Sequence, residues 1–110
     1  GAILYSIYIR KFTASIEEIS STMLHFSATV HTFGGSYTYR GTVTVQKKVG
    51  NTYINIDKKT TTYSGAGPFT FTYGHYVHTT GTYRAYCTVE VLSGSTVLET
   101  QSRASTDLTV

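Results

Sequence analysis

Apolar and polar residues alternate along most of this 110-residue chain, and Gly, Ser or Asn interrupts the alternation about every ten residues. The alternation is clearest from Met23 to Thr32, from Thr38 to Lys48 and from Thr82 to Leu92, and it begins again at Pro68. Successive side chains of a β-strand point to opposite faces of its sheet, so each segment predicts a strand with one buried and one solvated face. The composition agrees, because the chain contains 21 Thr and 10 Tyr, which favour a pleated sheet over a helix. The sequence therefore predicts an all-β fold.

The remaining segments are less regular. A first strand is predicted from Ile3 to Arg10, whereas residues 11–22 are expected to be loosely extended or to form one turn. A turn at Val49–Asn51 predicts a hairpin to a short edge strand at Tyr53–Ile56, and the segment Lys58–Thr62 is expected to return the chain to solvent. About seven short antiparallel strands are typical of a two-sheet sandwich. We therefore expect one β-sandwich domain over residues 1–110.

Charge and cysteine content exclude several classes of protein. Nine Lys and Arg against six Asp and Glu give a net charge of +3, which is too small and too scattered to predict nucleic-acid binding. Cys87 is the single cysteine, so no intramolecular disulfide can form. No run of 18 apolar residues occurs, so membrane insertion is not expected. Because no charged segment followed by an apolar one opens the chain, we expect either a cytosolic protein or the mature part of an exported one.

The segment Gly81-Thr82-Tyr83 opens a long alternating strand and resembles the tyrosine corner of immunoglobulin-like sandwiches. Together with TVTVQKKVGN, GTYRAYCTVEV and VLETQSRAST, it resembles the small exported immunoglobulin-like proteins of Gram-positive bacteria. That resemblance implies export, no catalysis and a structural role for Tyr83. The chain departs from antibody-type domains because Ala85 stands where their cysteine would fall and because the third strand has no Trp.

Four histidines, His25, His31, His75 and His78, are the candidate metal ligands. If the strand at 23–32 pairs with the one that begins at Pro68, His25 and His78 share an outer face and could be neighbours. Both strands lack the carboxylates that would complete a site, so we predict no metal and no cofactor and keep the His25/His78 face as an alternative. The sequence has no G-x-S-x-G motif, and the alternation places Cys87 on the apolar face as a buried, unreactive thiol.

One outer sheet face is the candidate binding surface. If residues 38–48 pair with residues 82–92, this face carries Arg40, Arg84, Tyr86 and Glu90, with Arg40 near Glu90 and Gln46 near Arg84. The alternative is an ordinary solvated sheet.

We therefore expect an exported, non-catalytic immunoglobulin-like module, secreted or at the cell surface, with a binding or structural role and a protein or glycan as partner. The alternative function is a small metal-dependent or hydrolytic protein that uses His25 and His78.

Overall fold

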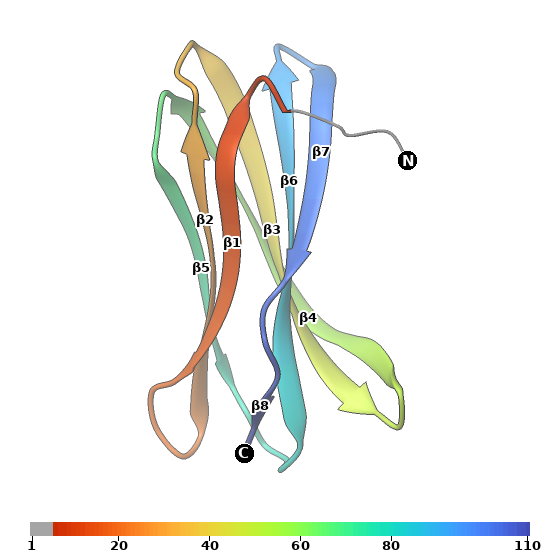
Figure 1. The fold of residues 1–110 in the computed structure, drawn as a ribbon. Coiled ribbons are helices and arrows are strands. Elements are labelled where there is room, and N and C mark those ends of the chain that lie inside the picture. The colour runs from red at the N-terminus through yellow and green to blue at the C-terminus, as the bar shows by residue number, and fades with distance from the viewer. Residues whose placement is uncertain (1–5) are drawn as a thin grey trace.

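The computed structural model describes residues 6–110 as two antiparallel sheets packed face to face (Figure 1). The predicted all-β sandwich is confirmed, and its single cysteine, Cys87, is free. The strands are β1 (Ile9–Glu18), β2 (Met23–Thr32), β3 (Tyr37–Val49), β4 (Thr52–Gly65), β5 (Phe69–Tyr76), β6 (Thr82–Ser93), β7 (Thr96–Ala104) and β8 (Leu108–Thr109).

The smaller sheet has the order β1-β2-β5, and the larger has the order β4-β3-β6-β7, with the short β8 paired to β6. The two pairings on which the candidate sites depend are confirmed, because β2 lies antiparallel to β5 and β3 lies antiparallel to β6. The β3–β4 hairpin extends away from the rest of the sandwich at one end (Figure 1). Among residues 6–110, no helix is long and apolar enough to cross a membrane.

Along most of β2, β3 and β6, every second side chain is buried between the sheets, as the alternation predicts. At Gly41 in β3, the ring of Phe71 from β5 lies directly over the backbone. A Cβ added at Gly41 would overlap the Phe71 ring. A glycine is needed here because only a residue without a side chain leaves room for the ring.

The first strand begins and ends later than expected. Of the described part of the predicted strand from Ile3 to Arg10, Ile9 and Arg10 are in β1 and residues 6–8 are not. The prediction for residues 11–22 is wrong over most of that segment, since β1 continues to Glu18. Residues 3–5 lie outside the described residues. A β-bulge causes the difference: Ile9 pairs with Thr32 and Lys11 with His31, so Arg10 is an extra residue. Because of the bulge, the buried positions change from odd-numbered residues at Ile9 to even-numbered residues at Phe12. The two short alternating segments therefore form one strand.

The edge strand is also longer than expected. The prediction that Lys58–Thr62 leaves the sheet is wrong, because β4 continues to Gly65 and pairs with β3 along its length. Its position at the edge of the larger sheet is confirmed. Lys58 and Lys59 stay exposed there, and charged side chains discourage pairing of an edge strand with other chains.

Candidate functional site

The predicted contacts on the outer face of the larger sheet are present. Arg40 Nε lies 2.8 Å from Glu90 Oε1, and Arg84 Nε donates to Gln46 Oε1 at 2.8 Å. The hydrogen bond from Arg40 lowers the pKa of Glu90. Arg40 and Gln46 lie six residues apart on β3, about 20 Å at the usual rise of a strand. The predicted surface is therefore two separate clusters, one at each end of the sheet.

Arg84 lies between two tyrosine rings. Its guanidinium carbon is 3.4 Å from the ring centroid of Tyr53 and 5.7 Å from that of Tyr86. The Tyr53 hydroxyl donates to the carboxylate of Asp107, with distances of 2.8 and 2.9 Å to its two oxygens. This hydrogen bond raises the pKa of Tyr53. Tyr53, Arg84, Tyr86 and Asp107, which we call the Arg84 cluster, thus form a pre-ordered surface of two aromatic rings and a cation.

Sequence reasoning identified Arg84 and Tyr86 but missed Tyr53 and Asp107. Tyr53 could have been found from the hairpin register, because the turn at Gly50 and Asn51 places it opposite Lys48. No sequence pattern identified Asp107 as a site residue, since it lies between β7 and β8 and reaches Tyr53 only in the folded protein.

Three pairs of hydroxyl groups on the outer face hydrogen-bond to each other. Neighbouring strands place the two members of each pair opposite each other, so these hydroxyls have a partner before any ligand arrives. The pairs are Thr38 with Ser64 at 3.2 Å, Thr42 with Thr60 at 2.8 Å and Thr88 with Ser102 at 2.9 Å.

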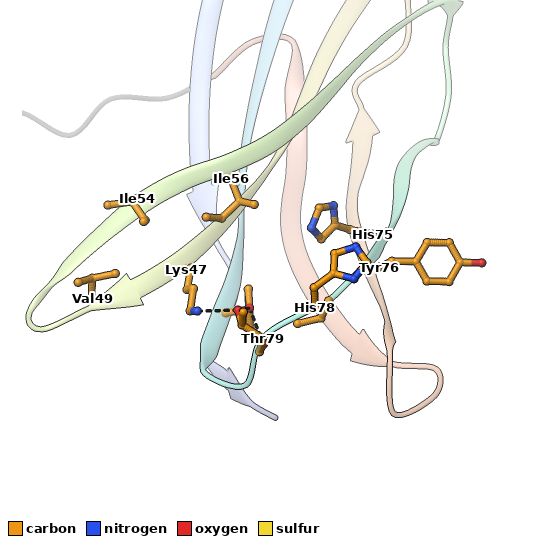
Figure 2. A pocket seen from close by; sticks show the side chains of 10 residues that line it. Lys47, Val49, Ile54, Ile56, His75, Tyr76, His78 and Thr79 are labelled. Carbon is orange, nitrogen blue, oxygen red and sulfur yellow. Dashed lines mark hydrogen bonds between the residues drawn. The ribbon is translucent and has the colours of Figure 1, made fainter.

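A groove of about 340 Å³ lies on the other side of the β3–β4 hairpin. Figure 2 shows the hairpin side chains of Val49, Ile54 and Ile56 on one side of it and His75, Tyr76 and His78 on the other. The three hairpin side chains are 53%, 44% and 44% exposed.

Lys47 supplies the cation of this groove, and its Nζ donates to Thr79 Oγ1 at 2.7 Å (Figure 2). The hairpin therefore carries an aromatic and polar face on one side and an apolar face on the other.

The structure does not bring the histidines together in one cluster. His25 lies opposite Gly74 in β5, whereas His78 follows the end of that strand and lines the groove beside the hairpin, so the register does not place the two histidines opposite each other. His75 Nδ1 lies 3.4 Å from Asp57 Oδ2, and the same oxygen accepts from the Tyr73 hydroxyl. Within residues 6–110, no group of three His, Cys, Asp or Glu side chains is placed to hold a metal.

Tyr83 and Cys87 lie where the sequence placed them. The Tyr83 hydroxyl donates to the backbone carbonyl of Thr79 at 2.8 Å, in the connection before Gly81. Cys87 is 0% exposed, and burial raises the pKa of its thiol to about 12. A thiol of that kind is a packing group and not a nucleophile.

Comparison of the chain with protein-family models, with curated proteins and with solved structures found no match to any of them. Function must therefore be inferred from the chemistry of its own surfaces.

Proposed function

We propose that this protein is an exported, non-catalytic module of the immunoglobulin-like class that binds a protein or a glycan at or outside a bacterial surface. The Arg84 cluster is the observation that carries the proposal. Tyr and Arg are among the residues most enriched at the positions that dominate binding energy, and here they are already held together before a partner arrives. Pre-ordering reduces the entropy lost on association.

The exposed hairpin extends this binding surface. Val49, Ile54 and Ile56 lie on the opposite side of the hairpin from Tyr53 and lose contact with water when a partner covers them. Arg40 and Glu90 lie at the far rim, where they neutralise each other. A partner that contacts both faces of the hairpin would bind the Arg84 cluster and the apolar groove together.

The immunoglobulin-like assignment is supported by two features. The sheets combine the strands in the orders β1-β2-β5 and β4-β3-β6-β7, which pairs the third strand with the penultimate long strand within the larger sheet. The Tyr83 hydroxyl reaches back to the backbone four residues upstream, as the corner tyrosine of that class does. Export is proposed from the resemblance to small Gram-positive proteins.

The alternative of a metal-dependent or hydrolytic protein is the weaker proposal, since the register places His25 opposite Gly74 and does not bring His78 beside it. His75 and Asp57 form a contact between β5 and β4, and they act as a link between the two sheets in this proposal.

The test compares charge reversals at the two ends of the outer face. Fluorescently labelled wild-type protein, Arg84→Glu and the matched control Arg40→Glu are bound to isolated Gram-positive cell walls and to cultured host cells, with thermal unfolding measured for each. We expect Arg84→Glu to weaken binding by roughly tenfold or more and Arg40→Glu to change it by less than about threefold. Equal binding by both variants, or no binding by the wild type, would overturn the proposal.

A further inference from the structure

A second groove, of about 330 Å³, lies between β1 and β7, at the end of the sandwich opposite the β3–β4 hairpin. Its lining includes Arg10, Lys11 and Arg103 together with the aromatic ring of Phe33. Phe33 belongs to the β2–β3 connection and is 60% exposed. The groove therefore combines three cations with an exposed aromatic ring.

The β-bulge in β1 is the reason that two consecutive cations line one groove. In a regular strand, Arg10 and Lys11 would point to opposite faces of the sheet. Because Arg10 is the extra residue between the pairs of Ile9 and Lys11, the bulge redirects its side chain and both residues line the groove. Bulges of this kind often occur beside functional sites, where they re-aim a side chain.

Arg103 is held in place across the groove. Its Nη1 donates to the carbonyl of Ser102 at 2.9 Å, and its Nη2 donates to Gln101 Oε1 at 3.1 Å. The guanidinium carbon lies 5.6 Å from the ring centroid of Phe12. A fixed guanidinium with donors to spare suits a planar oxyanion such as a carboxylate or a sulfate ester.

No carboxylate neutralises these cations. Among residues 6–110, the ion pairs join Arg40 to Glu90, Lys48 to Asp107 and His75 to Asp57, and residues 1–5 include no Asp or Glu.

The acidic side chain nearest in the hydrogen-bond network is Glu99. Glu99 accepts from Ser6 Oγ at 2.6 Å and from Gln101 Nε2 at 3.4 Å. Gln101 also accepts from Arg103, so Glu99 is linked to Arg103 only through Gln101. The groove keeps an excess of positive charge.

We propose that this groove binds an acidic saccharide. Arg10, Lys11 and Arg103 bind its sulfate or carboxylate groups, and the exposed face of Phe33 packs against the apolar face of a sugar ring. Three cations around a concave groove fit a chain one sugar wide, whereas single-stranded nucleic acid would require a row of aromatic rings along a longer basic track. This site is separate from the Arg84 cluster, so a test of saccharide binding here does not depend on the proposed function of that cluster.

Isothermal titration with a sulfated heparin octasaccharide and with a tetragalacturonate tests the site at 0.15 M salt. The variants are Arg10→Gln/Lys11→Gln, Arg103→Gln and Phe33→Ala. The matched control is Lys58→Gln/Lys59→Gln, which also removes two positive charges, but from the exposed edge strand β4.

We expect the wild type to bind at least one of the two saccharides and both cation variants to weaken that binding roughly tenfold or more. The control should change it less than about threefold, because distant charges are screened at this salt concentration. Phe33→Ala should weaken saccharide binding and leave inorganic sulfate binding unchanged.

Four results would overturn the proposal. These are no binding of either saccharide, an equal loss in the Lys58/Lys59 control, inorganic sulfate bound as tightly as the saccharides, and stronger binding to vesicles of phosphatidylglycerol than to either saccharide. Thermal unfolding of each variant checks its fold, and Arg10 and Lys11 are exposed, so we expect the protein to stay folded when they are replaced.

Discussion

Removing the Tyr83 hydroxyl should destabilise the protein by a predictable amount. Tyr83 is 3% exposed, and its hydroxyl donates to the carbonyl of Thr79 at 2.8 Å. Loss of a hydrogen bond that leaves a buried group unpaired costs about 1–3 kcal/mol. Thr79 itself is exposed, so water can reach its carbonyl, and we expect Tyr83→Phe to cost about 1–1.5 kcal/mol, the low end of that range.

The expected change is large enough to measure in two ways. A loss of 1 kcal/mol lowers the Tm of a domain of this size by about 4–8 °C. It also lowers the urea midpoint by roughly 0.3–1 M, given the usual denaturant dependence of small domains. The chain contains no Trp, so far-UV circular dichroism is the better probe.

Tyr86→Phe is the matched control. Tyr86 lies on the outer face of the same strand, and its hydroxyl has no hydrogen-bond partner within residues 6–110. Its removal should change the free energy of unfolding by less than about 0.5 kcal/mol. If Tyr83→Phe and Tyr86→Phe unfold at the same urea midpoint, the hydrogen bond to Thr79 does not stabilise the connection and the corner interpretation is wrong.

Three further predictions concern the core and the link between the sheets. Cys87 should react slowly with DTNB in the native protein and rapidly in urea, because burial raises its thiol pKa to about 12; rapid native labelling would contradict its place in the core. Gly41→Ala should cost about 1–3 kcal/mol in urea unfolding, because the added Cβ overlaps the Phe71 ring; an unchanged midpoint would mean that the ring moves freely. The hydrogen bond from Tyr73 lowers the pKa of Asp57, so its stabilisation is present above the ordinary Asp pKa and lost as pH falls. Asp57→Asn should therefore flatten the loss of stability as pH falls below the ordinary Asp pKa, and an unchanged pH dependence in that range would argue against this link.

The central strands could be predicted from the sequence because they alternate over most of their length. Along most of β2, β3 and β6 every second side chain is buried, so the pattern alone gives the strand and its inner face. The same register arithmetic placed Arg40 beside Glu90 and Gln46 beside Arg84. These contacts depend on one strand pair only, which is why no tertiary information was needed.

The rest of the candidate site depends on elements that meet only in the folded protein. Asp107 reaches Tyr53 from the segment before β8, and no local pattern links the two. The suggested proximity of His25 and His78 rested on strand parity, but β5 ends at Tyr76, so parity does not place His78. His78 lies in the connection after β5 and lines the groove beside the hairpin.

The bulges connect these irregularities with function. Strand pairing in residues 6–110 shifts at Arg10, at Ile56 and at Leu98, and the first two of these residues line grooves. Regular stretches pair their hydroxyl groups across neighbouring strands, so they offer a ligand little that is unpaired. A residue in a bulge has no direct partner opposite, and its side chain is free to line a cavity. In β1 the change is visible in the sequence as a move of the apolar positions from the odd-numbered Ile9 to the even-numbered Phe12. A break in parity that leaves two cations at the break therefore marks a surface where ligand binding should be tested before the regular sheet faces.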